Sequence, residues 1–389
     1  MEQEADWLRA RECARELASP LSSELVPVAE LDRRVLAVDC YAQCNLPGFA
    51  TSAMDGWAVC GPGPWQVTGD VPAGEPLPRA IMPGEAVRIA TGAVVPVGAD
   101  AILRWEDATR TASLLSGAVE PGRDIRSAGE ECSRGDLIAS TGTLISPALC
   151  GLLAATGHDL IPVRRRPRVG VLLLGDELLT SGIPIDGRVR DSLGPQIPGW
   201  VARAGGIVTC QEHVADSLSM TAAAIARHAA SCDLVITTGG TAAGPRDHLH
   251  AALMAIGANI QVDRVRVKPG HPMLLADLPL ADQRSVPIVG LPGNPHSAVV
   301  GLVTLVIPLL DGLLGRPEGE LVRVQTDAEL RTHSGQTRLI AGRIVDGAFH
   351  LSDYAGSAML RGLAHSDGFA VVRESIEAGM EVPWLPLPG

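Results

Sequence analysis

Runs of apolar residues alternate with a helical pattern in the second half of the chain. Four short apolar runs predict strands at 169–174, 233–238, 262–267 and 286–290. Residues 217–231 instead carry apolar side chains at helical spacing, and they lead directly into the strand at 233. This order of strand, helix and strand predicts an α/β domain with a mostly parallel sheet.

The regions on either side of this domain have a different pattern. Residues 42–133 are dense in Gly, Pro and short β-branched runs and lack long helical periods, which favours a small β-rich domain. Residues 317–389 contain several short strand patterns and Gly-Pro turns, which are typical of another small β domain. The basic stretch 164–168 marks the change into the α/β region, and residues 315–319 punctuate its end.

Length and charge limit the classes of function. The chain has 389 residues, 46% of them hydrophobic, which is enough for two or three domains with their own cores. The formal net charge of −12 argues against a general nucleic-acid surface. An acidic protein that binds an anion needs a local positive patch, and Arg264, Arg266, Lys268 and His271 supply one. The alternative for this patch is a solvated basic strand.

Cysteines, the first residues and the apolar runs all indicate a cytoplasmic protein. The eight cysteines show no C-x-x-C spacing, so they predict reduced core residues and neither a disulfide framework nor a zinc site. The start of the chain is acidic and lacks the apolar region of a signal peptide. The longest apolar run, Ala298–Leu310, contains Pro308 and is shorter than the roughly 20 residues that a membrane span needs.

The stretch Leu291–Pro295 predicts an anion site at the start of a helix. It closes the strand at 286–290, and an apolar helix is expected from Ser297. Asn294 suits the N-cap and Pro295 suits the first helical position. Free N–H groups and the helix dipole can hold a phosphate there, and the Ser297 hydroxyl can bind the same anion. The alternative is a well-capped turn without a ligand.

Three further loops follow predicted strands. They are Gly175-Asp176-Glu177-Leu178, then Gly239-Gly240 with Asp247 seven residues later, then Lys268-Pro269-Gly270-His271-Pro272. Ligands of open α/β sheets bind beyond the carboxyl ends of the strands. One pocket is therefore expected to hold all four loops.

These loops, in this order, resemble those of the molybdopterin molybdenumtransferases, the molybdenum-insertion enzymes of molybdenum cofactor synthesis that include the gephyrin E-domain group. Residues 47–58, 88–100 and 356–360 are similar to three further signatures of that family, so the resemblance spans almost the whole chain.

The resemblance implies an elongated subunit of four domains. A three-layer α/β molybdopterin-binding domain (167–316) would be joined by an extended β-rich domain (42–133) and a C-terminal small β domain (317–389). A linking domain would be split between 1–41, which also holds an N-terminal helix, and 134–166. It also implies a homodimer in which the α/β domain of one subunit and the β-rich domain of the other share each active site.

The resemblance further implies the chemistry. The family takes adenylylated molybdopterin and molybdate and yields molybdenum cofactor and AMP. Such a reaction calls for Mg²⁺, which Glu177 and Asp247 would bind. The implied catalytic residues are Asp55, Thr91, Glu177, Asp216, Asp247 and Lys268. The implied ligand-binding residues are Gly239, Gly240, Arg264, His271, Pro272, Pro292, Gly293, Asn294, Pro295, Ser297 and Ser357.

Several of these residues have a purely structural alternative. Asp216 precedes a helix, so N-capping alone would explain it. Asp55 and Thr91, which would reach across the dimer, could instead cap a turn. Lys268 could be an ordinary surface lysine.

The chain also departs from the family pattern. His271 stands in place of a lysine, Leu193 in place of an asparagine, and Leu174 in place of a threonine. Residues 239–244 replace a GGVS-type loop. Ala341 takes the position of an arginine expected at the molybdate, and Arg338 or Arg343 is a candidate to compensate for it.

Three hypotheses for function follow. The first is a divergent molybdenumtransferase. The second is a pterin-binding, nucleotide-binding or scaffold protein without catalysis, which the lost cations favour. The third is an enzyme acting on another phosphate ester, because residues 239–247 drift toward the pattern of the molybdopterin adenylyltransferases. A molybdopterin adenylyltransferase is also a candidate partner.

Overall fold

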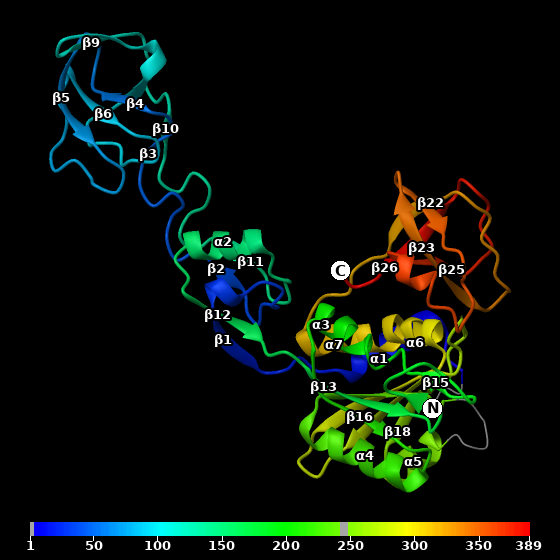
Figure 1. Ribbon diagram of the computed structural model, residues 1–389. Helices are drawn as coiled ribbons and strands as arrows, with labels where there is room; N and C mark the ends of the chain where they lie inside the picture. Colours follow the sequence, from blue (N-terminus) through cyan, green and yellow to red (C-terminus); the bar gives the residue numbers. More distant parts are fainter. Residues whose placement is uncertain (1–3, 242–247) are drawn as a thin grey trace.

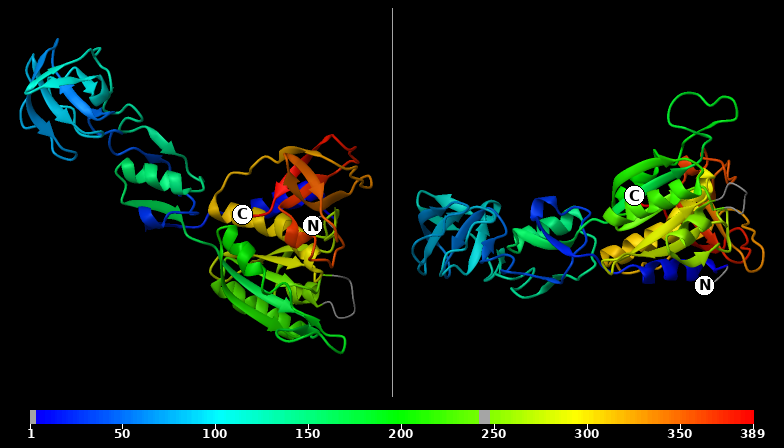
Figure 2. Two further views of the ribbon diagram at one scale, coloured as in Figure 1. Left: turned by 45° about the horizontal axis from the view of Figure 1, so that its top comes forward. Right: turned by 90° about the horizontal axis from the view of Figure 1, so that it is seen from below.

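The computed structural model describes residues 4–241 and 248–389 of the chain. The molecule is elongated: a β-rich body lies at one end, a small linking body follows, and an α/β body and a C-terminal barrel lie together at the other end (Figure 1). The two further views show the same separation (Figure 2). Asp247 lies outside the described residues.

A six-stranded sheet forms the centre of the α/β body. Its first four strands are parallel, the fifth runs antiparallel to both of its neighbours, and the sixth again runs in the direction of the first four, so the predicted mostly parallel sheet is confirmed. In spatial order the strands are β16 (Ile207–Val214), β13 (Arg168–Leu174), β17 (Leu234–Thr238), β21 (Ser285–Leu291), β20 (Leu274–Pro279) and β18 (Asn259–Asp263).

The strand predicted at 262–267 is wrong. β18 already ends at Asp263 and runs antiparallel at the edge of the sheet. Arg264 then takes a left-handed conformation (φ 71°), and a separate two-residue strand, β19 (Val267–Lys268), leaves the sheet. The apolar pattern continues through the break, because Val265 and Val267 are buried against other parts of the chain. A pattern of apolar residues cannot distinguish this from one continuous strand.

Helices cover both faces of the sheet. Alternate residues of β13 point to opposite sides, so Val171 belongs to one core and Leu172 to the other. On the first face lie α1 (Trp7–Leu17), α3 (Ile197–Arg203) and the long last helix of the α/β body. On the second face lie α4 (Leu218–Ser231) and α5 (Leu249–Ala255). The helix predicted at 217–231 is confirmed as α4.

The long helix consists of α6 (Pro295–Gly301), a π-helical segment (Leu302–Val306) and α7 (Ile307–Leu314). The π segment precedes Pro308, which has no N–H to donate to the carbonyl one turn earlier. The Thr304 hydroxyl in this segment donates to the Val300 carbonyl (2.7 Å) and accepts from Trp7 Nε1 (3.0 Å). Trp7 thereby ties α1 to the helix.

This helix is longer than the 13-residue run noted above. It has 20 residues, Pro295–Leu314, and its most apolar stretch of 18 residues has a mean hydropathy of 2.1, so by length and composition it could cross a membrane. However, 89% of that stretch is buried inside the protein, as is typical of a core helix.

The linking body contains two antiparallel strand pairs and one helix. These elements are β1 (Ser23–Pro27) with β12 (Leu160–Arg164), β2 (Cys40–Tyr41) with β11 (Leu137–Ala139), the 3₁₀ turn Val28–Glu30, and α2 (Pro147–Ala155). Ser146 caps α2 by accepting from the Leu149 N–H at 3.2 Å. The chain passes through this body twice, on its way to the β-rich body and back.

The β-rich body is a six-stranded sheet with an additional pair. The sheet runs in the order β7 (Ala101–Arg104), β4 (Gly56–Val59), β6 (Glu85–Ile89), β5 (Trp65–Val71), β9 (Leu114–Ser116) and β8 (Thr109–Thr111). The pair is β3 (Thr51–Ser52) with β10 (Ile125–Arg126), and a 3₁₀ turn covers Trp105–Asp107.

The C-terminal body is a small barrel. Its strands are β22 (Val322–Thr326), β23 (Thr337–Val345), β24 (Ala348–Leu351), β25 (Gly368–Val372) and β26 (Glu381–Pro386), with a 3₁₀ turn at Leu363–His365. β23 pairs with both β24 and β25, which closes the ring of strands and leaves no free edge at that point. β19 adds to β23 from outside the ring, so the loop at Lys268 is joined to the barrel.

The prediction of core cysteines holds for three of the eight. The structure contains no disulfide in the part it describes, and Cys40, Cys60 and Cys232 are buried. Cys13, Cys132, Cys150 and Cys210 are only half-buried, and Cys44 is exposed. Nothing in the local sequence pattern separates it from the buried cysteines.

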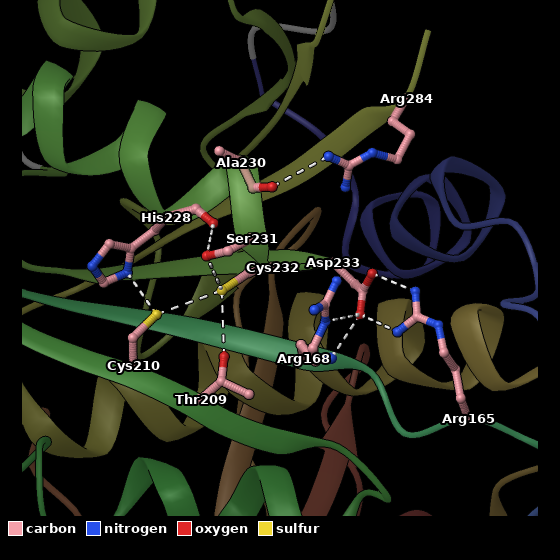
Figure 3. A network of polar contacts seen from close by, with 10 residues as sticks. All are labelled: Arg165, Arg168, Thr209, Cys210, His228, Ala230, Ser231, Cys232, Asp233 and Arg284. Carbon is pink, nitrogen blue, oxygen red and sulfur yellow. Dashed lines mark hydrogen bonds and ion pairs between the residues drawn. The ribbon is translucent and has the colours of Figure 1, made fainter. Parts of the chain in front are cut away.

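An ion pair fixes the amino ends of the two central parallel strands. The Asp233 carboxylate, which precedes β17, accepts two bonds from the Arg165 guanidinium (2.6 and 2.7 Å) and one from the Arg168 N–H (2.8 Å) (Figure 3). The Asp233 N–H in turn donates to the Arg168 carbonyl (2.7 Å). Burial opposes the charge, but the Arg165 and Arg168 contacts hold the pKa of Asp233 below its usual value.

We predict that Asp233→Asn lowers the free energy of unfolding by about 2–3 kcal/mol, because it leaves Arg165 without its bidentate partner in a largely buried pair. Urea denaturation measures this. Since the folded-state pKa of Asp233 lies below the unfolded one, the difference between wild type and variant should be constant at neutral pH. It should shrink as the pH falls below about 4.

The matched control is Asp282→Asn, which removes an exposed pair with Arg284 and should change stability by less than about 0.5 kcal/mol. Equal effects of the two substitutions would show that the Asp233 pair has no special role.

Candidate functional site

A cavity of about 840 Å³ opens at the carboxyl ends of the parallel strands. The loops after β13, β17 and β21 border it, as expected, together with the segment that follows β15. The expected site residues that line it are Glu177, Asp216, Gly239, Gly240, Pro272, Pro292, Gly293, Asn294 and Pro295. The structure therefore brings three of the four expected loops together, with one residue of the fourth.

Carboxylates form one corner of this cavity. The Asp216 N–H donates to Asp176 Oδ1 (3.2 Å), and the Asp176 N–H approaches Asp216 Oδ2 (3.5 Å). Gly175 has a positive φ of 140°, and a Cβ there would lie 2.8 Å from Glu177 Oε2. This tight turn places the Glu177 carboxylate over the end of β13.

The capping alternative for Asp216 is wrong. Ser217 occupies the N-cap of α4, and the Asp216 side chain is instead paired with the Asp176 backbone. Helix capping therefore gives no reason for an acidic residue at position 216, which leaves its carboxylate available to the cavity.

Glycines let two of the loops approach each other closely. Gly239 and Gly240 both have positive φ (81° and 68°). A Cβ on Gly239 would lie 3.0 Å from the Leu174 carbonyl, and one on Gly293 would lie 3.8 Å from the Gly239 Cα. A side chain on Gly239 would crowd the Leu174 carbonyl and would strain a backbone with positive φ, so glycine at 239 allows this close approach of the loops.

The start of α6 differs from the expectation in three ways. The helix begins at Pro295, not at Ser297, and the Asn294 side chain makes no capping bond although the residue holds the N-cap position. The N–H groups of His296 and Ser297 are not free: both donate to the Ser357 carbonyl, at 3.1 and 3.2 Å. Ser297 itself is buried and does not line the cavity. The barrel supplies this partner from 60 residues away, which no local pattern could have indicated.

The loop that contains Lys268 borders a second cavity, of about 440 Å³. β19 pairs with β23 in a register that sets Lys268 opposite Arg338, and Arg331 and His333 also line this cavity. Lys268 is the only lysine of the chain; every other residue of the Lys and Arg set is arginine. A further cavity of about 860 Å³ on the barrel holds none of the expected site residues.

Arg264 and His271 contact residues near the N-terminus and do not line the first cavity. His271 Nε2 lies 2.7 Å from Glu4 Oε1, and the Arg264 carbonyl accepts from the Ala5 N–H (3.1 Å). Pro272, at the end of the same loop, does line the first cavity. One loop thus borders both cavities.

Asp55 and Thr91 contact each other in the β-rich body. The Thr91 N–H and hydroxyl both donate to Asp55 Oδ1, at 2.7 and 3.0 Å. These bonds lower the pKa of Asp55, which is therefore ionised at neutral pH. Both residues are exposed, and within one chain their body lies at the far end of the molecule from the first cavity (Figure 1).

Two charged residues that line this cavity, Arg190 and Asp191, were not among the expected site residues. They follow β14 (Leu178–Leu179), which pairs with β15 (Val189–Arg190); the loop between these strands projects from the α/β body (Figure 2). Asp191 is buried and accepts from the N–H groups of Leu193 and Gly194, both at 2.9 Å. Among the described residues, Arg190 is the one basic side chain that lines this cavity.

The departures from the family pattern have structural roles. Leu193 and Leu174 are buried and belong to the cores on the two faces of the sheet. Ala341 is 1% exposed and packs in the core that the barrel shares with the α/β body. Of the two candidates to compensate for it, Arg338 lies beside Lys268, whereas Arg343 is exposed and does not line that cavity.

Comparison with known proteins covers nearly the whole chain. Three family models match: the MoeA N-terminal region (domain I and II) at residues 6–157, a probable molybdopterin-binding domain at 170–312, and the MoeA C-terminal region (domain IV) at 323–387. The chain is 34% identical to molybdopterin molybdenumtransferase 2 of Mycobacterium tuberculosis, over 75% of this chain and 76% of that protein. It is 29% identical to the molybdopterin molybdenumtransferase of a Nostoc species, over 96% and 90%.

The fold is also shared with a solved structure. The molybdopterin biosynthesis moeA protein of Pyrococcus horikoshii superimposes with a TM-score of 0.84, covering 99% of this chain and 100% of that one, at 22% identity.

We predict that Arg190→Ala weakens the binding of AMP about tenfold, because it removes the guanidinium that faces this cavity and a charge-assisted hydrogen bond is worth about 1.5 kcal/mol. Isothermal calorimetry with AMP measures the change. Arg188→Ala, two residues earlier and outside the cavity, is the matched control and should bind AMP like wild type. Equal affinity of wild type and Arg190→Ala would remove Arg190 from the site.

Proposed function

The chain belongs to the molybdopterin molybdenumtransferase family, and we propose that it inserts molybdate into adenylylated molybdopterin and releases AMP. Its role is thus in the biosynthesis of the molybdenum cofactor. The observation that carries the proposal is the first cavity, where acidic residues and Arg190 line one hollow at the ends of the parallel strands.

The composition of this cavity supports a phosphate-bearing organic substrate. Its glycine loops bring backbone close to the ligand, and Arg190 can pair with a phosphate in a bidentate manner. Leu174 at the end of β13, Leu178 of β14 and Leu193 add an apolar wall. A planar ring system with attached phosphate groups fits such a mixture of apolar and polar surface.

We assign Mg²⁺ to the acidic corner, with Glu177 and Asp247 as the proposed ligands and Asp216 in support. Carboxylates are the oxygen donors that Mg²⁺ prefers, and Glu177 and Asp216 both line the cavity. The described part of the chain contains no cluster of three ligating side chains, so water and substrate phosphate would fill the other coordination positions of the ion. When bound, the ion would neutralise the charge that develops on the bridging phosphate oxygens.

For molybdate we propose the second cavity, with Lys268 and Arg338 as its cations. The two residues are neighbours across the β19–β23 pair. Thr332 and Ser375 also line the cavity, although their hydroxyls donate to the Gln336 and Thr332 carbonyls. A compact ammonium and a guanidinium together suit a small tetrahedral dianion. Arg338 would then compensate for the alanine at position 341.

We also propose a cytoplasmic homodimer with shared active sites. Asp55 and Thr91 lie too far from the first cavity to serve it within one chain (Figure 1). Both hydrogen bonds from Thr91 go to Oδ1 of Asp55, so Thr91 leaves Oδ2 of this exposed carboxylate to other ligands. The absence of disulfides among the described residues supports a reducing compartment.

We predict that the purified protein releases AMP from adenylylated molybdopterin only when molybdate and Mg²⁺ are both present. Lys268→Met and Arg338→Met should each raise the KM for molybdate about tenfold, the loss expected for one charge-assisted contact. The measurement is AMP release against molybdate concentration.

Arg343→Met is the control on the same strand, and its KM should equal that of wild type. A KM for molybdate that does not change in either Lys268→Met or Arg338→Met would exclude the second cavity as the molybdate site. Absence of AMP release from wild-type protein would favour a binding or scaffold protein instead.

The shared site predicts complementation between two inactive variants. Asp55→Ala and Glu177→Ala homodimers should both be weakly active, since each carries two damaged sites. After subunit exchange, a heterodimer has one site with both lesions and one intact site. With random mixing about half of the dimers are mixed, so AMP release should recover to about a quarter of wild type.

The control is a mixture of the same variants kept below the conditions that allow exchange, which should remain inactive. If tag pull-down verifies exchange and activity still does not recover, each active site is contained in one subunit.

A further inference from the structure

His296 is a buried histidine in an apolar setting. It is the second residue of α6, is 1% exposed, and is followed by the buried residues Ala298, Val299 and Val300. Buried polar side chains need hydrogen-bond partners, so the partner of this ring indicates what it does.

The ring of His296 reaches across to two elements of the C-terminal barrel. Its Nδ1 lies 3.2 Å from the Gly356 carbonyl. A carbonyl only accepts, so Nδ1 must carry the proton. The ring also stacks on Phe369 of β25, with ring centroids 5.9 Å apart and planes 24° apart.

The backbone of the same helix turn also forms hydrogen bonds to the barrel. The N–H groups of His296 and Ser297 both donate to the Ser357 carbonyl. Three hydrogen bonds thus hold Gly356 and Ser357 against the start of α6. The next residue, Ala358, lines the first cavity beside Asn294 and Pro295.

We propose that His296 is a positioning residue, whose Nδ1–H holds the segment Gly356–Ala358 in place as one wall of the substrate cavity. The kinetic part of this proposal rests on the proposed function; the structural part does not. The side chain supplies the one bond of the three that a substitution can remove without changing the backbone.

The state of the ring agrees with this role. Nε2 is buried and has no hydrogen-bond partner in the part of the chain that the structure describes. Burial lowers the pKa of His296, so the ring is neutral at neutral pH. A neutral ring with its proton on Nδ1 is the form that donates to Gly356.

The strength of the bond indicates which effect its loss would have. One neutral hydrogen bond shifts an equilibrium by about 2- to 10-fold. The barrel is also held by apolar packing, in which Leu339, Val371 and Phe369 share a core with the α/β body. Loss of the His296 bond should therefore loosen the segment without detaching the barrel.

The test compares three variants by hydrogen–deuterium exchange of residues 292–300 and 354–362. His296→Phe keeps an aromatic ring on Phe369 but removes the donor, and should raise exchange in both segments about 3- to 10-fold. His296→Asn keeps an N–H near the position of Nδ1 and should restore most of the protection. Leu339→Ala weakens the apolar packing at the same interface and should lower the thermal midpoint without this local pattern.

Kinetics provide the second measurement. His296→Phe should raise the KM for adenylylated molybdopterin about 3- to 10-fold and leave kcat within about twofold, with His296→Asn close to wild type. If His296→Phe is too unstable to assay, His296→Val removes the donor without adding volume.

Unchanged exchange in His296→Phe, failure of His296→Asn to restore it, or the same pattern in Leu339→Ala would each overturn the proposal. So would altered exchange with an unchanged KM, because the segment would then not shape substrate binding. If wild type releases no AMP, the proposed function fails, but the exchange experiment still decides whether His296 holds the segment.

Discussion

The burial of one long apolar helix, Pro295–Leu314, determines how the rest of the molecule is arranged. A helix that is apolar on all sides must be covered on all sides. The sheet covers one side, α1 covers another through Trp7 and Thr304, and the barrel covers the start through Phe369. Gly312 allows the close approach of α1, because a Cβ there would lie 2.7 Å from the Ala18 Cβ. The N-terminal and C-terminal parts of the chain therefore meet at this helix.

The same burial explains why the cavity is built from two bodies. The first N–H groups of a helix need partners, and at a covered helix start water cannot supply them. The Ser357 carbonyl from the barrel satisfies two of them. Because the partner is a carbonyl from the barrel, the cavity beside it acquires Ala358 as part of its wall. The contact that supplies acceptors to the N–H groups of the helix start therefore also places a barrel residue in the cavity wall.

The features that the sequence could predict are those set by neighbouring residues. Strands 169–174 and 286–290 and helix 217–231 were predicted because their apolar patterns match a local period. The features that it could not predict depend on distant partners. The strand at 262–267 is split because Ala5 bridges to Val265 and β19 joins the barrel. Arg190 was not predicted as a site residue because its strand has only two residues, too few for a recognisable apolar pattern. The roles of the expected site residues remain predictions.

The placement of charge also follows from these distant contacts. The chain carries a net charge of −12, so an anionic substrate needs cations beside its binding site. Arg190 borders the first cavity, whereas Lys268 and Arg338 border the second. On the proposed assignment, the organic phosphate and the metalate would each have their own cations. Two like unit charges at 4 Å repel by about 4 kcal/mol near a protein surface, and cations at each cavity would offset such repulsion. The loop from Lys268 to Pro272 borders both cavities, and it is the element through which occupancy of one could affect the other.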